Sequence, residues 1–210
     1  MKRVESIFRE ILYQAMEQKE AVFTQSELSK KLGISLSIVN SAVKKLENMG
    51  AVKIKTRSFQ VIDIRKVLYY WASIRDIRKD IIFKARIELP VREIERIMPN
   101  VIFTAYTAFK LNYNDVPADY SEIYVYADES QRSLIKERIE KIGETNKAKV
   151  NINSNNSNVF VLKKDSNLDS YGHIPLAQVF VDLWNLKEWY AKEFLKELEN
   201  KIKLDFIKGG

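Results

Sequence analysis

The sequence predicts an α+β chain whose first third is mostly helical and whose remainder alternates strands with helices. Three helical patterns and a hairpin occupy residues 1–63, and mixed α/β elements fill the rest of the 210 residues. With 46% hydrophobic residues the chain has ample apolar side chains for a buried core, so disorder is not expected.

Apolar residues recur every three or four positions over residues 4–16, which predicts an amphipathic helix. A second, short helix is predicted over residues 26–33, capped by Thr24 or Ser26 and ended by a glycine. Ser35 is the expected cap of a third helix, which Gly50 ends. The expected buried stripe of this third helix consists of Leu36, Val39, Val43 and Leu46.

The periodicity changes to two after Gly50, which predicts a two-stranded hairpin. Ala51, Val52 and Ile54 alternate with lysines, and Arg57 and Ser58 form the expected turn before a second apolar run at residues 59–62.

Three helices followed by a basic hairpin are the order of a winged helix-turn-helix. In this arrangement the second helix packs across the third, and the outer side of the third enters a DNA major groove about 12 Å wide. Packing is expected from Leu28, Leu32, Ile34 and Leu36. The expected outer side of the third helix carries Ser35, Ser37, Ile38, Asn40, Ser41, Lys44 and Lys45.

These residues define a candidate site for double-stranded DNA. Asn40 has the side chain for a bidentate contact with adenine, and short polar side chains allow close approach to base edges. Phosphate contacts are expected from Lys44, Lys45, Lys53, Lys55 and Arg57. Glu47 is the single acidic residue between positions 44 and 57.

The distribution of charge agrees with this site. The net charge is +7, but residues 1–98 hold 20 Lys and Arg against 12 Asp and Glu, whereas residues 99–210 hold 15 against 16. The positive excess therefore lies in the half that carries the candidate site, where it would attract a phosphate backbone.

Several other classes of protein are not expected. The chain has no cysteine, which excludes disulfides and cysteine-based zinc sites, and we expect no cofactor and no metal. No signal peptide or membrane-spanning stretch is recognisable, so a cytoplasmic protein without membrane contact is predicted.

The remaining elements suggest three segments: a winged helix-turn-helix domain at 1–63, a linker helix within 64–80, and an α/β domain at 81–210. The linker helix is predicted from Ile64 to about Ile77. Strands are predicted at 81–87 and 121–126, a hairpin at 150–152 and 159–162, and helices at 91–98, 104–111, 131–142 and 174–202, the last with a break near Asn185.

Two blocks of sequence resemble a known family. Residues 23–33, FTQSELSKKLG, followed by residues 37–51, SIVNSAVKKLENMGA, are similar to the winged-helix regulators of the MarR-like group. In that group the second block holds the recognition helix, so the resemblance implies DNA binding without naming an operator.

The whole chain also resembles the AbiEi-type transcriptional regulators. The resemblance is carried by residues 103–111, FTAYTAFKL, residues 123–126, IYVY, and residues 174–184, IPLAQVFVDLW. It implies a winged helix joined to a nucleotidyltransferase-like domain, and the role of antitoxin, with a toxin-like protein as partner, in a two-gene system that represses its own promoter.

Catalytic residues of a nucleotidyltransferase are missing. Such an enzyme needs a Gly-Ser turn for the triphosphate and two carboxylates, two residues apart, for magnesium. Here the turn position is 104–106, Thr-Ala-Tyr, and Glu122 is followed by Tyr124 rather than by a second carboxylate. We therefore expect no enzymatic activity.

The last helical stretch has a wide apolar face that suits either packing against the sheet or a homodimer interface, and a regulator that reads a two-fold operator needs two copies. The apolar face consists of Trp184, Leu186, Trp189, Tyr190, Phe194, Leu195, Leu198 and Ile202. Two alternatives to a DNA-binding regulator stay open: a nucleotidyltransferase guided by the winged helix, and an adaptor that uses the winged helix to dock a protein.

Overall fold

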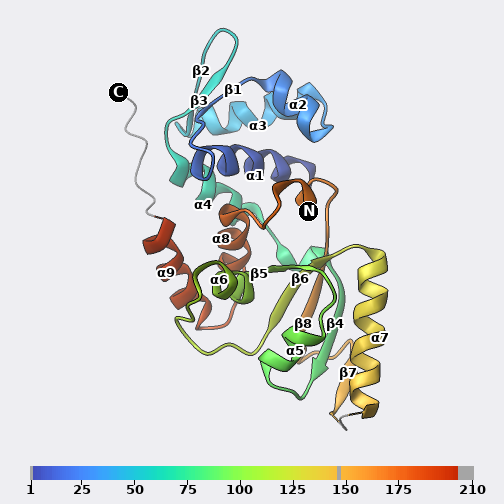
Figure 1. Ribbon diagram of the computed structural model, residues 1–210. Helices are drawn as coiled ribbons and strands as arrows, with labels where there is room; N and C mark the ends of the chain where they lie inside the picture. Colours follow the sequence, from blue (N-terminus) through green and yellow to red (C-terminus); the bar gives the residue numbers. More distant parts are fainter. Residues whose placement is uncertain (1, 146–147, 203–210) are drawn as a thin grey trace.

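The computed structural model describes residues 2–145 and 148–202, which form two parts stacked end to end (Figure 1). The first part combines helices with a three-stranded sheet, and the second is built around a five-stranded sheet. Within these two ranges no helix has the length and apolarity that a bilayer crossing requires.

The N-terminal part follows the predicted order of helices and hairpin. Its elements are α1 (Arg3–Met16), α2 (Gln25–Leu32), α3 (Leu36–Asn48), β2 (Val52–Ile54), β3 (Phe59–Val61) and α4 (Ile64–Ile74). A strand that the sequence analysis missed, β1 (Val22–Phe23), pairs antiparallel with β3, which also pairs with β2. Two residues are too few for an alternating pattern to reveal a strand.

The helix predicted to reach Ile77 ends earlier, at Ile74. Arg75 leaves the helical conformation with ψ 138°, and residues 77–80 form a short 3-10 helix, η1 (Ile77–Asp80). The physical reason lies in the side chain of Arg75, which is buried among several oxygen atoms described below.

The second part contains the predicted strands and helices and one more strand, β5. Its elements are β4 (Ile81–Ile87), α5 (Val91–Ile97), β5 (Ile102–Thr104), α6 (Ala105–Tyr113), β6 (Ile123–Ala127), α7 (Glu129–Thr145), β7 (Val150–Ile152), β8 (Val159–Lys163), η2 (Leu168–Tyr171), α8 (Leu176–Trp184) and α9 (Ala191–Ile202). The predicted break near Asn185 is confirmed, because α8 ends at Trp184.

The prediction of a β7–β8 hairpin is wrong. The strand order is β5-β6-β8-β4-β7, so β4 lies between the two strands and pairs antiparallel with both. Asn158 explains part of this preference, since its amide donates to the carbonyl of Ile87 at 2.9 Å and its oxygen accepts from the same residue's N–H at 2.9 Å. The side chain of Asn158, just before β8, thus binds the end of β4, whereas the sequence analysis expected β8 to pair with β7.

Helices cover both faces of the five-stranded sheet. Ile94 of α5 and Ile135 and Ile139 of α7 pack on one face, together with Ile123 and Val125 of β6. Tyr124 and Tyr126, which alternate with them on β6, face α6 and α8 on the other side. The period of two along β6 therefore supplies two separate cores.

One of these cores continues into the N-terminal part. Ile7 of α1, Val43 of α3 and Trp71 of α4 belong to the same buried cluster as Phe180 of α8 and Phe109 of α6. α4, which was expected to join the two halves, is therefore part of the core, and α1 packs against both α3 and α8.

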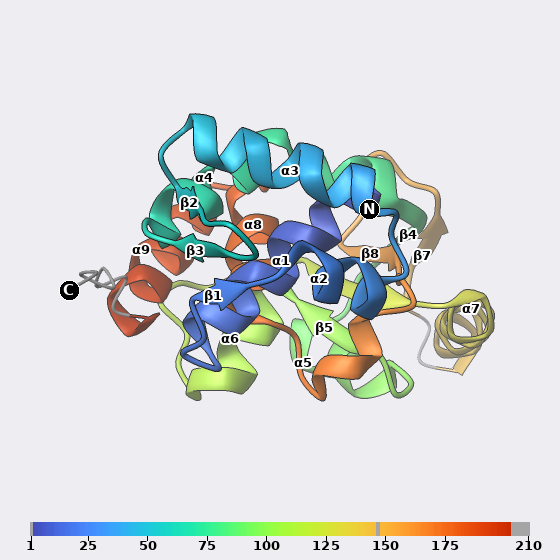
Figure 2. The ribbon, with the colours of Figure 1, turned by 90° about the horizontal axis from the view of Figure 1, so that it is seen from above.

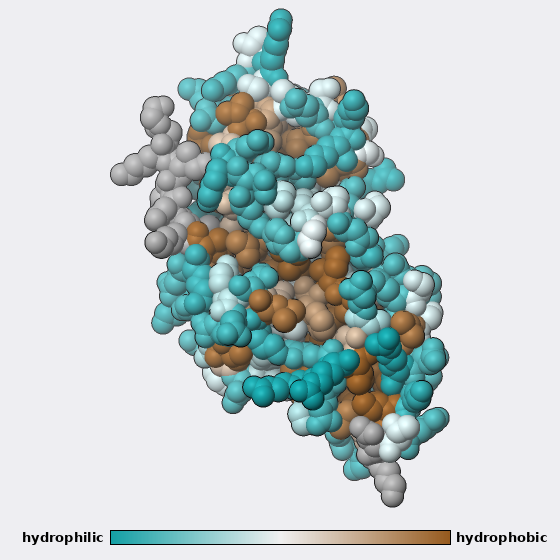
Figure 3. All heavy atoms as spheres, in the orientation of Figure 1, coloured by the Kyte–Doolittle hydropathy of each residue, from teal (hydrophilic) through white to brown (hydrophobic). Residues whose placement is uncertain are grey.

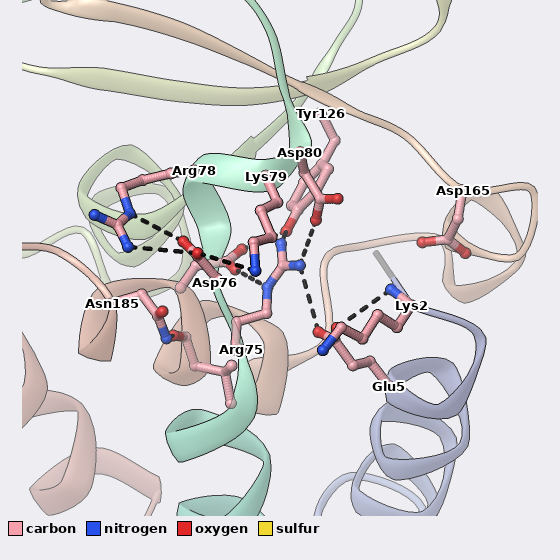
Figure 4. Close-up of polar contacts among 12 residues, drawn as sticks. Lys2, Glu5, Arg75, Asp76, Arg78, Lys79, Asp80, Tyr126, Asp165 and Asn185 are labelled. Atoms are coloured by element: carbon pink, nitrogen blue, oxygen red, sulfur yellow. Dashed lines mark hydrogen bonds and ion pairs between the residues drawn. The ribbon is translucent and has the colours of Figure 1, made fainter.

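Arg75 lies at the centre of a buried polar network between the two parts (Figure 4). Its guanidinium contacts Glu5 of α1 at 3.4 Å, Asp182 of α8 at 3.4 Å and the hydroxyl of Tyr126 at 3.1 Å, and it forms a close ion pair with Asp80. Burial alone would lower the pKa of Arg75, but these oxygen atoms outweigh it and raise the pKa. The guanidinium stays charged and ties α1, η1, β6 and α8 together.

A second ion pair crosses the same junction. Arg9 of α1 makes a bidentate pair with Asp165, at 2.7 and 2.6 Å, in the loop after β8. Burial alone would raise the pKa of the Asp165 carboxyl, but the hydrogen bonds and charge of Arg9 lower it. Both basic residues that anchor this junction are thus engaged with carboxylates of the second part.

Candidate nucleic-acid interface

The turn between α2 and α3 is fixed by local hydrogen bonds. Thr24 caps α2 by accepting from the N–H of Glu27 at 3.1 Å, which decides between the two caps that the sequence allowed. Gly33 ends α2 with φ +63°, a left-handed conformation that favours glycine. The hydroxyl of Ser29 then donates to the carbonyl of Ile34 at 2.6 Å, so the turn holds α3 at a set angle to α2.

One side of α3 is buried and the other faces solvent. Val39, Ala42, Val43 and Leu46 are at most 1% exposed and pack in the core. Ser35, Ser37, Ser41, Lys44 and Lys45 are all exposed, as predicted. Figure 2 shows α3 along one edge of the molecule, where the second part does not cover it.

Two details of α3 differ from the prediction. Leu36, at the first position of the helix, is 52% exposed and not buried, whereas Ile34 in the preceding turn is packed in the core at 6% exposure. Ser35 begins the helix with its backbone, but its side chain makes no capping hydrogen bond. Its hydroxyl therefore remains available to another partner.

Asn40 is half-buried and has a partner on α2. Its amide nitrogen donates to the side-chain oxygen of Gln25 at 3.0 Å. The sequence analysis did not single out Gln25, since nothing in the local pattern links it to a residue fifteen positions away. One amide hydrogen of Asn40 is used by this bond, and the oxygen and the second hydrogen are not.

The wing, defined here as residues 52–61, carries its basic side chains outward. Lys53, Lys55 and Arg57 are exposed, and the N–H of Lys55 donates to the carbonyl of Ser58 at 2.8 Å to close the turn. Glu47 of α3 accepts from the N–H of Ile54 at 3.3 Å. The single carboxylate of this region therefore joins α3 to the wing.

Five basic side chains of α3 and the wing have no acidic partner in the part of the chain that the structure describes: Lys44, Lys45, Lys53, Lys55 and Arg57. Lys31 of α2, by contrast, pairs with Glu10 at 2.6 Å. Unpaired cations beside a polar helix face form a surface suited to a polyanion.

Comparison with known protein families agrees with this geometry. Residues 9–59 match a family model described as an HTH domain. The HTH domain thus covers the second half of α1 from Arg9, the α2–α3 pair and the hairpin up to the first residue of β3. No curated protein and no solved structure gives a significant match to this chain.

The HTH domain and the exposed basic face together support a DNA-binding regulator. The polar side of α3 and the cations of the wing all belong to the matched segment, which omits from the wing only the last two residues of β3. The predicted residues therefore lie on one continuous region of α3 and the hairpin.

Proposed function

We propose that this protein is a transcriptional regulator that binds double-stranded DNA with sequence specificity. One observation carries the proposal: the polar face of α3 is exposed and is flanked by five unpaired cations within an HTH domain. In this arrangement α3 enters the major groove, and the wing contacts the phosphate backbone beside it.

The five cations set the expected dependence of binding on salt. Each phosphate contact to duplex DNA releases counterions and adds about −0.9 to the slope of log K against log salt concentration. If each of the five side chains neutralises one phosphate, the slope is about −4.5 for one copy of the chain.

Asn40 is the residue best placed to read a base. A bidentate contact with adenine needs the amide oxygen and one amide hydrogen. Both remain after the bond to Gln25, which holds the amide plane in one orientation. Gln25 therefore positions Asn40 and does not itself touch the base.

Fluorescence anisotropy with duplex DNA from upstream of the protein's own gene tests the proposal. The variant Lys44→Ala/Lys45→Ala should bind more weakly, with a salt slope smaller in magnitude by about 1.8. The matched control is Lys192→Ala/Lys196→Ala, which removes two exposed lysines of α9 and should leave the slope unchanged.

A separate measurement tests sequence specificity. Asn40→Ala should lower the affinity for the upstream duplex more than the affinity for a random duplex of equal length. Equal affinity of the parent protein for both duplexes would contradict the proposal that binding is sequence-specific. The adaptor alternative predicts a different outcome. The parent protein would then show no affinity for duplex DNA, and the Lys44→Ala/Lys45→Ala variant would bind a protein partner as tightly as the parent does.

We also propose a homodimer, as a two-fold operator requires. Most of the apolar face predicted on the last helices is used inside the chain: three of its residues are buried and three more are partly buried against the core, namely Tyr190, Phe194, Leu198, Leu186, Leu195 and Ile202. Trp184 and Trp189 stay 46% and 71% exposed and support an interface at this end. A mass of one chain at micromolar concentration, by light scattering, would contradict it.

The nucleotidyltransferase-like character of the second part and the absence of catalysis are further proposals. Ala105, at the expected phosphate-binding turn, has φ +52°, a conformation that favours the glycine of such a turn. The carboxylate of Glu122 binds the hydroxyl of Tyr190, and Tyr124 stacks on Phe160 where a second carboxylate is needed. Magnesium-dependent transfer of labelled nucleotide that is lost in Glu122→Gln would refute the absence of catalysis.

The role of antitoxin is likewise proposed from the resemblance alone. A nucleotidyltransferase toxin encoded beside this gene, and a stable complex of the two purified proteins, are the expected results. Toxicity of the neighbouring product that this protein does not suppress would refute the role.

A further inference from the structure

We propose that a hollow between α5 and α6 binds a small organic anion that carries an aromatic ring. The hollow has a volume of about 300 Å³ and lies in the second part, away from α3 and the wing. Its lining combines cations with apolar side chains: Arg92, Glu95, Arg96, Phe103, Thr107, Lys110 and Leu111. The proposal does not depend on DNA binding.

The floor of the hollow is polar and internally neutralised. Glu95 accepts from the hydroxyls of Thr107 at 3.0 Å and Tyr120 at 2.8 Å, and it forms a close ion pair with Lys110. Its side chain is only 13% exposed. The carboxylate is therefore fully engaged, and its charge is offset by Lys110 before any ligand arrives.

The rim supplies two cations that are not engaged. Arg92 and Arg96 lie one helical turn apart on α5, and both are exposed. Neither forms an ion pair with any residue in 2–145 or 148–202. Two guanidinium groups on one side of a hollow suit a carboxylate or phosphate, which guanidinium binds with paired hydrogen bonds.

The opposite wall is apolar. Phe103 of β5 is half-buried and leaves part of its ring toward the hollow, and Leu111 of α6 is 63% exposed. Figure 3 shows hydrophobic surface over α6 next to strongly hydrophilic side chains over α5. A ring placed against this wall would cover apolar surface that now faces water.

Size and charge together define the ligand class. Small-molecule sites have volumes of about 300–1,000 Å³ and combine apolar walls with a few polar groups. The hollow is at the lower limit, so a single ring with one anionic group fits better than a larger molecule. The test below compares a phosphate with a carboxylate to decide which anionic group the hollow prefers.

The test is a titration of the protein with four small probes. Isothermal calorimetry measures the affinity, and amide NMR shifts locate the binding site. Phenyl phosphate and phenylacetate are the two probes that carry both ring and anion. Inorganic phosphate carries the anion alone, and benzyl alcohol carries the ring alone. We expect at least one of the first two probes to bind at least tenfold more tightly than either of the others, with shifts centred on α5 and α6.

Variants locate the site. Arg92→Gln/Arg96→Gln should weaken binding of the preferred probe at least tenfold, whereas Lys192→Gln/Lys196→Gln, with the same loss of charge, should not. A control shows that the Arg92→Gln/Arg96→Gln variant is folded. Its affinity for duplex DNA should equal that of the parent protein. If the parent binds no DNA, the far-UV circular dichroism spectra of the variant and the parent should be the same.

The proposal is overturned if inorganic phosphate binds as tightly as both ring-bearing probes, or if the two double variants weaken binding equally. It is also overturned if no probe produces shifts on α5 and α6 at millimolar concentration. Each of these results leaves the DNA-binding proposal untouched, because the hollow and the polar face of α3 share no residue.

Discussion

Removal of Arg75 tests whether the two parts of the molecule are held together by the buried network. In the variant Arg75→Met an apolar side chain of similar length replaces the guanidinium. Glu5, Asp80 and Asp182 then lose their common cation, and all three side chains are at most 10% exposed.

The expected magnitude follows from burial. Breaking a buried ion pair by removing one partner costs about 3–5 kcal/mol, because the other charge is left uncompensated in a poorly solvated position. The free energy of unfolding of a native protein is about 5–15 kcal/mol, so the variant loses a large share of it. With a urea m-value of about 2–3 kcal/mol/M, a loss of about 4 kcal/mol lowers the midpoint by roughly 1.3–2 M.

Urea unfolding followed by circular dichroism and by tryptophan fluorescence measures this change, because Trp71 lies beside the network and donates to Glu5 at 3.2 Å. Arg78→Met is the matched control, since Arg78 pairs with Asp76 at the surface and its side chain is 68% exposed. The control should keep the parent's midpoint. A loss below about 1 kcal/mol in Arg75→Met would refute the reasoning.

Three further substitutions test local features. Asp165→Asn should lower the unfolding free energy at neutral pH by about 2 kcal/mol. The lowered pKa of Asp165 stabilises the fold above its unfolded pKa of about 3.9, so the difference should shrink as pH falls below about 4, which urea titrations at several pH values measure. Asn158→Ala should cost about 2–4 kcal/mol in the same assay, because the buried N–H and carbonyl of Ile87 both lose their partner; an unchanged midpoint would contradict this. Gly33→Ala should cost about 1 kcal/mol through backbone strain alone, since no atom lies within 4 Å of the added carbon, and thermal unfolding would show it.

Local rules predicted most of the N-terminal part. The three- and four-residue spacing of apolar side chains predicted α1 and α3. The two glycines that were predicted to end helices, Gly33 and Gly50, both have positive φ. The exposed basic face could also be predicted, because polar residues on an amphipathic helix lie opposite its buried stripe. These features depend on neighbours within a few positions.

Features that depend on distant partners could not be predicted in the same way. β7 and β8 are separated by a short polar segment that suits a turn, yet each pairs with β4, far earlier in the chain. The bond between Gln25 and Asn40 joins two helices, and no spacing rule relates them. Arg75 and Asp182 are 107 positions apart, so their contact follows only from the packing of α4 against α8.

α1 connects the candidate DNA-binding face to the rest of the molecule. It packs on α3 with one side and on α4 and α8 with another, and its residues Glu5 and Arg9 form ion pairs with Arg75 and Asp165. An apolar contact alone permits sliding, whereas buried ion pairs have a narrow range of good geometry. α3 therefore has a fixed orientation relative to the five-stranded sheet. In the proposed homodimer, an interface formed by the second part would then set the distance between the two copies of α3, and hence the spacing of the operator half-sites.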